Sequence, residues 1–530
     1  MPNINTILDQ HVVFQCECID RLYLNAYIPI LQLPGHLVSF LVKHRQQPIL
    51  SPALLGRLTR DFIASVERFA EEQSIPIVHF QKGQRKEEVA RRYFERASGK
   101  EGVVLIGIAQ EKTTAFRAYR PKRSPSGVPH YDFARASACV NHYYFYILDR
   151  DFGPSFIKLC SYAPFAGRVW LNGHEWVKRQ LQKRGILFTA LDNCLLDAPD
   201  AASVQDVCDQ LSAYHVQAFF RRWMAVLPQP LTAEDRRAGY HHDLSILQFE
   251  VSLTQVFDRP LSGRQFFEEV IRDHIDLGRP SSVQLIFGRK VTRRTPGRFR
   301  TRILTSDVDP SLHLDYKRSR IKQYYKQGRA LRTETTINDT RDFGIGRSLS
   351  NLPDLRNIGR EANRRLLDAQ RMSQHCAISA DSFQQVVLPS SVDGQRAPSL
   401  RLGDPRVMAL FSSLCQFCHL PDGFTNATLR TLVAAHLGQP DYSSRQMTYD
   451  LRRLRRKGFI QRLDGTHHYM LTAPGRRLAF FFAKSYARIL QPGLQHLDPS
   501  APHSHSQLAL AWHRFDQAIN SLIHDARLAP

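Results

Sequence analysis

Five acidic residues occupy positions that could serve metal-dependent chemistry on phosphodiesters. Cutting or joining a phosphodiester in this way requires two or three carboxylates that converge on Mg²⁺. Asp149 and Asp151 flank an arginine at the end of an aromatic strand, Glu175 lies where a helix should begin, Glu250 lies in a predicted strand, and Glu334 lies in the middle of another. The alternative is that these acids cap turns and pair with the abundant arginines. Further acids at predicted strand ends or helix starts include Asp20, Glu111 and Asp339.

The segment from Arg289 to Arg332 is the most charged part of the chain, and its basic residues far outnumber its acids. A two-residue turn at Gln327-Gly328 would pair Lys326 with Arg329. Alternation along the strands then predicts that Arg332 and Glu334 share one face. The opposite face would carry Arg320, Lys322, Tyr324, Lys326 and Arg329. Cations beside an aromatic ring suit a groove that follows a phosphate backbone and stacks a base, and a solvated sheet face is the alternative.

Near the C-terminus, residues 404–490 have the pattern of a compact helical module. Residues 426–436 predict one helix, 438–442 a turn, and 443–457 a second helix that is rich in arginine. Two short strands follow, with Asp464-Gly465 between them, and Asp-Gly is a strong hairpin signal. This order resembles a winged-helix domain, in which the second helix of a helix-turn-helix pair reads DNA.

The resemblance implies that the arginine-rich helix contacts nucleic acid. Residues in the first two turns of such a helix usually touch base edges, and here they are Ser443, Arg445, Gln446 and Tyr449. Residues nearer the hairpin suit phosphate contacts, and these are Arg453, Arg456 and Lys457. Met447, Leu451 and Leu454 recur at the spacing of a buried face. The alternative is a protein–protein or dimerisation module.

Two other segments, Asn172–Glu175 and Leu331–Thr335, are similar to segments of large uncharacterised bacterial proteins. No activity follows from that resemblance.

The strand and helix signals around these residues predict a multi-domain α+β or mixed α/β protein with mixed or antiparallel sheets. Strand and helix signals alternate at first and become β-rich after about residue 113. We expect five parts: an α/β domain at 1–200 with a β-rich second half, an α+β domain at 201–378 with the basic hairpin, a linker at 379–403, the winged helix at 404–492, and a polar tail with a terminal helix at 493–530.

The composition favours a polyanionic partner. The chain has 530 residues, with 72 Lys and Arg against 49 Asp and Glu, and a formal net charge of +23. So large an excess indicates nucleic acid before an anionic membrane surface. No apolar run approaches the length of a transmembrane helix. The nine cysteines are scattered, which does not suggest a disulfide framework and predicts a reducing cytoplasm.

Three hypotheses follow. The first is a nucleic-acid-binding protein, with DNA favoured over RNA, that uses the winged helix and the basic β surface, in replication or mobile-element maintenance. The second is a Mg²⁺-dependent nuclease or strand-transfer enzyme that uses some of the five acids. The third is a transcription regulator. Three of these five carboxylates within bridging reach of one metal would favour the enzyme, whereas scattered carboxylates that each lie beside an arginine would favour the binder.

Overall fold

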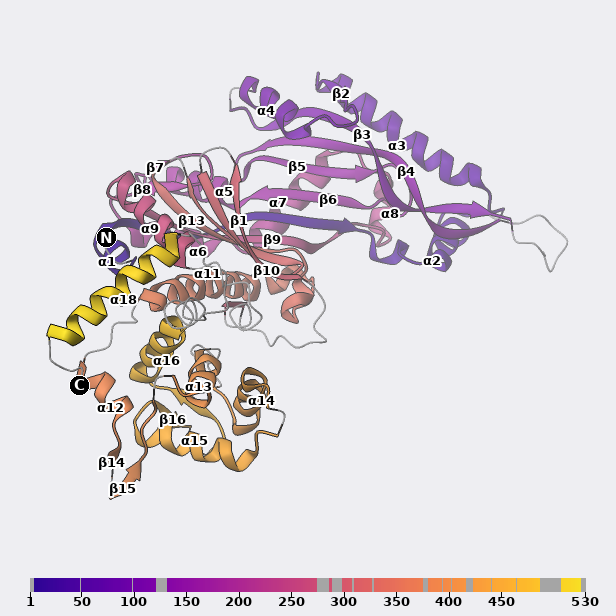
Figure 1. Cartoon of the computed structure of the whole chain (residues 1–530). Coiled ribbons are helices and arrows are strands. Elements are labelled where there is room, and N and C mark those ends of the chain that lie inside the picture. The colour runs from indigo at the N-terminus through magenta and orange to yellow at the C-terminus, as the bar shows by residue number, and fades with distance from the viewer. Residues whose placement is uncertain are drawn as a thin grey trace. The chain divides into compact units, whose positions relative to one another are not determined.

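The computed structural model divides the chain into two compact units, which we call unit 1 (residues 1–367) and unit 2 (residues 368–530). Each unit is described by itself (Figure 1). The residues that the structure describes are 4–525 apart from 48, 98, 121–130, 274–285, 288–297, 307–308, 327, 375–379, 393, 402, 416–422, 440, 464 and 487–506.

Unit 1 is built on one 11-stranded sheet, whose order is β10-β11-β12-β13-β9-β1-β6-β5-β4-β3-β2. Neighbouring strands are antiparallel except β2 and β3, which are parallel. The strands are β1 (Val12–Tyr27), β2 (Ile77–His79), β3 (Gly102–Tyr119), β4 (Asp132–Asp149), β5 (Gly153–Cys160), β6 (Gly167–Asn172), β9 (Asp243–Phe257), β10 (Arg298–Ser306), β11 (Asp309–Lys317), β12 (Ser319–Lys326) and β13 (Ala330–Ile337).

Helices and one short hairpin surround this sheet. The helices are α1 (Ile4–His11), α2 (Pro34–Ser39), α3 (Pro52–Glu72), α4 (Lys86–Arg96), α5 (Gly173–Lys183), α6 (Ala201–Gln210), α7 (Ala213–Val226), α8 (Ala233–Arg237) and α9 (Pro260–Asp273), followed by α11 (Leu352–Gln374). The hairpin consists of β7 (Thr189–Ala190) and β8 (Leu195–Asp197). Figure 1 shows α11 lying along the sheet, and Asn363 in α11 donates a hydrogen bond of 3.1 Å to the Val251 carbonyl of β9. The prediction of mixed sheets with helices is confirmed.

The sheet runs across the domain boundary that we predicted at residue 200. β1, from the first predicted domain, pairs along its length with β9, from the second. Local periodicity cannot reveal this pairing, because the two strands lie more than two hundred residues apart in the chain. The chain therefore does not divide at residue 200, and the first unit continues to Leu367.

Unit 2 has a helical core with two small hairpins. Its elements are α12 (Ala380–Val387), β14 (Ser390–Val392), β15 (Gln395–Ala397), α13 (Pro405–Cys415), α14 (Asn426–Leu437), α15 (Ser444–Arg456), β16 (Ile460–Arg462), β17 (Tyr469–Leu471), α16 (Ala473–Ser485) and α18 (Gln507–Asp525). The segment 379–403, which we predicted to be a linker, contains a helix and a hairpin. Val386 and Leu400 from this segment are fully buried in the core of unit 2, so the segment is part of the fold.

Two further observations concern the described residues as a whole. No helix among them is long and apolar enough to cross a lipid bilayer. The described cysteines carry free thiols, and they are Cys16, Cys18, Cys139, Cys160, Cys194, Cys208 and Cys415.

Candidate functional site

Three buried carboxylates converge in the middle of the unit 1 sheet: Asp20 of β1, Glu250 of β9 and Glu334 of β13. One oxygen from each lies within 4.8 Å of the others. We call this group the carboxylate cluster. A register shift in β1 helps to form it, because Ile19 pairs with Val251 while Arg21 already pairs with Glu250. Asp20 is thus the extra residue of a β-bulge, a feature that re-aims a side chain within a strand.

Two arginines neutralise part of the cluster. The Arg332 guanidinium donates to Asp20 and, at 2.9 Å, to Glu334. Arg21 makes a two-pronged ion pair with Glu250, with its shortest contact at 2.8 Å. Arg332 is fully buried, whereas the Arg21 side chain is 46 % exposed. The cluster therefore has one fixed internal cation and one cation at its solvent side.

The surroundings of Asp20 and Glu250 shift the pKa values of these two carboxylates in opposite directions. Burial works to raise the pKa of Asp20, but Arg332 and His174 outweigh burial and hold that pKa well below its usual range. Burial, together with the charges of Asp20 and Glu334, raises the pKa of Glu250. Burial also lowers the pKa of His174, which favours its neutral form. Glu250 therefore holds a proton more readily than Asp20 does.

The start of α5 closes one side of this cluster. Asn172 caps the helix by accepting a hydrogen bond of 3.2 Å from the Glu175 amide, and His174 lies buried against Asp20. Gly173 leaves no room for a side chain, because a Cβ there would stand 1.9 Å from the Ile19 carbonyl oxygen. A glycine at this position therefore lets the helix start approach the bulge in β1.

We expect Gly173→Ala to destabilise unit 1 by about 1–3 kcal/mol, since either α5 or the β1 bulge must move. Gly35→Ala in α2 is the matched control, because a Cβ there meets nothing within 4 Å. Urea unfolding followed by tryptophan emission measures both variants. Equal midpoints for the two alanine variants would show that the close approach at Gly173 carries no strain.

The other three predicted acids do not join the cluster. Asp149 accepts hydrogen bonds from two amides of its own turn and pairs with Arg222. Asp151 also pairs with Arg222, at 3.2 Å, and Glu175 pairs with Lys178 one helical turn away. Turn formation and ion pairing therefore account for these side chains, as the alternative in the sequence analysis allowed.

The basic hairpin differs from its predicted register by one residue. Tyr324 pairs with Arg332, and Lys326 pairs with Ala330. The connection therefore has three residues rather than two, with Gly328 in the left-handed region at φ +66°. A shift of one residue exchanges the two faces of a strand. Arg332 consequently lies on the same face as Tyr324, not on the opposite face as we predicted.

With this register, the predicted hairpin residues and the carboxylate cluster share one sheet face. In the strand register, Lys322 of β12 lies opposite Glu334 of β13, and Glu250 of β9 lies opposite Arg21 of β1. The Tyr324 hydroxyl donates to Glu334 at 2.8 Å, and the Lys322 ammonium lies 4.2 Å from the Tyr324 ring centre. Of the remaining hairpin cations, Arg320 and Arg329 are exposed. The Lys326 ammonium lies 3.8 Å from the Asp192 carboxylate.

In unit 2, α15 agrees closely with the predicted arginine-rich helix. It spans Ser444–Arg456, and Ser443 is its N-cap. The Ser443 hydroxyl accepts from the Gln446 amide, and the Gln446 side chain accepts in return from the Ser443 amide at 2.7 Å. The predicted inner face is buried through Met447, Leu451 and Leu454. Ser443 and Gln446 thus have a structural role as a capping box.

Three of the basic residues that we predicted to contact nucleic acid are engaged inside unit 2. Arg453 is buried and pairs at 3.1 Å with Asp450, which is itself fully buried. The Lys457 ammonium is buried and donates to the carbonyls of Gln385 and Leu388 at 2.8 and 2.9 Å. Arg456 is half-buried and donates to the backbone of the segment before α13. These contacts place Arg453 and Lys457 off the open surface.

The exposed side of α15 carries Arg445, Tyr449, Arg452 and Arg455, which we call the arginine face. Within the part of the chain that the structure describes, the three arginine side chains contact no acid. The Tyr449 ring is 47 % exposed and lies beside the guanidinium groups of Arg406 and Arg453. We did not predict a role for Arg452 and Arg455, although their spacing from Arg445 places all three on one side of a helix.

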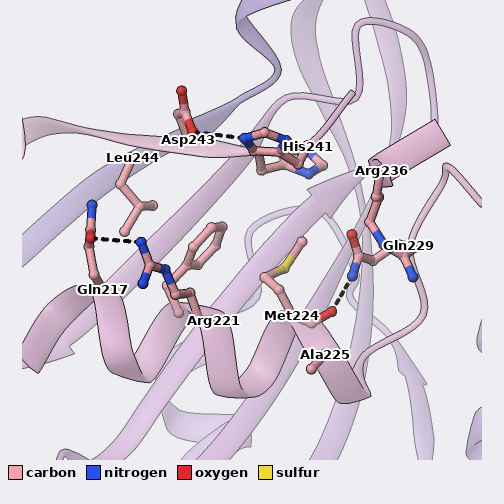
Figure 2. A pocket seen from close by; sticks show the side chains of 11 residues that line it. Gln217, Arg221, Met224, Ala225, Gln229, Arg236, His241, Asp243 and Leu244 are labelled. Carbon is pink, nitrogen blue, oxygen red and sulfur yellow. Dashed lines mark hydrogen bonds and ion pairs between the residues drawn. The ribbon is translucent and has the colours of Figure 1, made fainter. Parts of the chain in front are cut away.

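A pocket of about 310 Å³ lies between α7 and the start of β9 (Figure 2). Its polar side chains already have partners: Arg221 donates to Gln217 at 3.3 Å, His241 pairs with Asp243 at 3.7 Å, and Arg236 donates to the Leu231 carbonyl at 2.7 Å. This pairing leaves no group there with an evident chemical role, and we assign no function to the pocket.

No family model, no curated protein and no solved structure matches this chain. The functional proposals therefore rest on the chain's own residues.

Proposed function

We propose that this protein binds nucleic acid, with DNA favoured over RNA, through the arginine face of α15. The observation that carries this proposal is a helix whose exposed arginines have no acidic partners among the described residues of a chain with a net charge of +23. Charges that are not neutralised inside the protein are available for phosphates. The order of α14, α15 and the β16–β17 hairpin supports a winged-helix assignment for this part of unit 2.

The position of each side chain suggests its role. Arg445 and Tyr449 lie in the first two turns of α15, where base edges are read in helix-turn-helix proteins. Arg452 and Arg455 lie closer to the hairpin and suit phosphate contacts. Arg445→Ala is accordingly proposed to reduce discrimination between sequences.

Unit 1 supplies a second cationic surface, at the hairpin that bears Arg320, Lys322 and Arg329. Two surfaces on one chain raise affinity through effective concentration. The free thiols suit the reducing cytoplasm in which we place the protein. Replication or mobile-element maintenance is the process that we propose for it.

A retardation gel of supercoiled plasmid in EDTA tests binding directly. We expect the purified full-length chain to retard the plasmid and leave it intact. Plasmid that migrates freely at every protein concentration would rule the proposal out.

A second candidate function, Mg²⁺-dependent cleavage or strand transfer, is favoured by the carboxylate cluster. Asp20, Glu250 and Glu334 are hard oxygen ligands of the type that Mg²⁺ prefers, and one oxygen of each lies within bridging reach of the others. When bound, the ion would stabilise the charge that develops on a phosphodiester. The fit is incomplete, because the Arg332 guanidinium lies between Asp20 and Glu334 and would have to move.

If this candidate holds, plasmid will be nicked or linearised in Mg²⁺ but not in EDTA. We then expect Glu334→Gln to reduce the nicking rate at least about a hundredfold, since the remaining carboxylates hold the ion less well. Asp151→Asn is the matched control, because Asp151 lies outside the cluster. Plasmid that stays supercoiled in Mg²⁺ would leave binding as the only proposed function.

A further inference from the structure

An aromatic pocket of about 850 Å³ opens on unit 1 beside the carboxylate cluster. It lies between α4 and strands β1, β4, β5, β6 and β9. Arg21 connects the two features, because its side chain lines the pocket while it pairs with Glu250. The volume is in the range of sites for small organic ligands, which span about 300–1,000 Å³.

Half-buried aromatic rings form the floor of this pocket. Tyr23 pairs with Trp170 across β1 and β6, and Trp170 pairs with Phe156 across β6 and β5. The Trp170 and Phe156 rings are nearly parallel, at 6° and with centres 6.1 Å apart. The Tyr23 ring meets Phe156 at its edge, at 67°. The strands thus present a row of flat rings whose outer faces are only partly covered.

Polar groups at the pocket can recognise the edge of a planar ligand. Asn193 and Gln248 line it, and the Gln248 side chain has no hydrogen-bond partner among the described residues. Amides offer both donors and acceptors, which is what the edge of a base requires. Three cations, Arg21, Lys86 and Arg91, and two acids, Glu87 and Glu95, line the pocket. Arg21 and Lys86 already pair with Glu250 and Glu111, so the charge of the pocket is mixed rather than strongly cationic.

We propose that this pocket binds an unpaired nucleobase of a single-stranded nucleic-acid segment by stacking it on Trp170 and Tyr23. The proposal rests on the proposed nucleic-acid partner but not on the arginine face of unit 2. A purely apolar occupant would bury the Gln248 amide without a partner, which is unfavourable. A base can hydrogen-bond the Gln248 amide and stack on the rings, as in proteins that bind single strands. The pocket would place the strand beside Glu250 and the hairpin cations of the same face.

Tryptophan emission of the full-length protein, titrated with an oligothymidylate, tests this site. Trp170 is one of four tryptophans, and two of the others, Trp176 and Trp223, are buried. We expect the oligonucleotide to quench the emission and Trp170→Phe to abolish that quenching while the fold and most of the affinity remain. Trp170→Ala and Tyr23→Ala should each weaken binding about fivefold to a hundredfold, measured by anisotropy of a labelled oligothymidylate.

Two controls make the outcomes distinct. Tyr162→Ala removes a 41 % exposed ring outside the pocket and should leave the affinity unchanged. Replacing Arg452 and Arg455 with alanine should leave the quenching intact. Quenching that persists in Trp170→Phe, or unchanged affinity in both alanine variants of the pocket, overturns the proposal. Duplex binding that survives alongside such a result would show that the pocket fails while the proposed function stands.

Discussion

Replacing Arg332 with methionine is expected to lower the free energy of unfolding of unit 1 by about 3–5 kcal/mol at pH 7, because it leaves buried carboxylates without their internal cation. Arg332 donates to both Asp20 and Glu334, and its side chain is only 1 % exposed. Methionine fills similar space but cannot neutralise charge. Urea unfolding followed by tryptophan emission measures the effect, since Trp170, Trp176 and Trp223 all lie in unit 1.

The stability lost in the Arg332→Met protein should become smaller as the pH falls. In the wild type the pKa of Asp20 is depressed, so its stabilising contribution is present above the unfolded pKa of about 4 and is lost only as the pH falls further. Without Arg332 the carboxylates of the folded protein should take up protons more readily. The difference between the two proteins should therefore shrink from pH 7 to pH 5. Arg329→Met, on an exposed cation of the same hairpin, should change stability by less than about 0.5 kcal/mol. An Arg332→Met protein as stable as this control would show that the buried charges need no cation.

The double variant Arg452→Ala, Arg455→Ala is expected to weaken binding of duplex DNA at least about tenfold at low salt, for all sequences alike. Each phosphate contact contributes about 0.9 to the slope of log affinity against log salt, so the slope should fall by about 2. Because both side chains are exposed and unpaired among the described residues, the fold should be unaffected. Fluorescence anisotropy of a labelled duplex over a series of salt concentrations measures both quantities.

Arg453→Ala provides the opposite control on the same helix. Its guanidinium is buried against Asp450, so its loss should lower the stability of unit 2. For the Arg453→Ala protein that remains folded, the slope of log affinity against log salt should equal that of the wild type. If Arg453→Ala reduces the slope and the double variant does not, our assignment of inner and outer faces of α15 is incorrect.

The sequence predicted α15 well because its signals are local. Ser443 caps the helix, and Met447, Leu451 and Leu454 repeat at helical spacing, so both the limits and the buried face follow from adjacent residues. The same pattern could not show which arginines have partners. Arg453 faces a buried acid, and Lys457 reaches carbonyls of residues far away in the chain.

The carboxylate cluster depends on contacts that local patterns do not contain. Glu250 and Glu334 were among the predicted acids, but Asp20 was only noted as one acid among several. It enters the cluster through a bulge in β1, and nothing in the surrounding residues distinguishes a bulge from a regular strand. The hairpin register failed for a related reason, since a left-handed Gly328 fits both a two-residue and a three-residue turn.

The affinity of the wild-type, full-length protein for duplex DNA as a function of salt tests the central proposal most directly. Binding through exposed arginines predicts a straight, steep line in which log affinity falls as log salt rises, because each neutralised phosphate releases counterions. A flat salt dependence, or no binding at low salt, would contradict nucleic-acid binding through the arginine face.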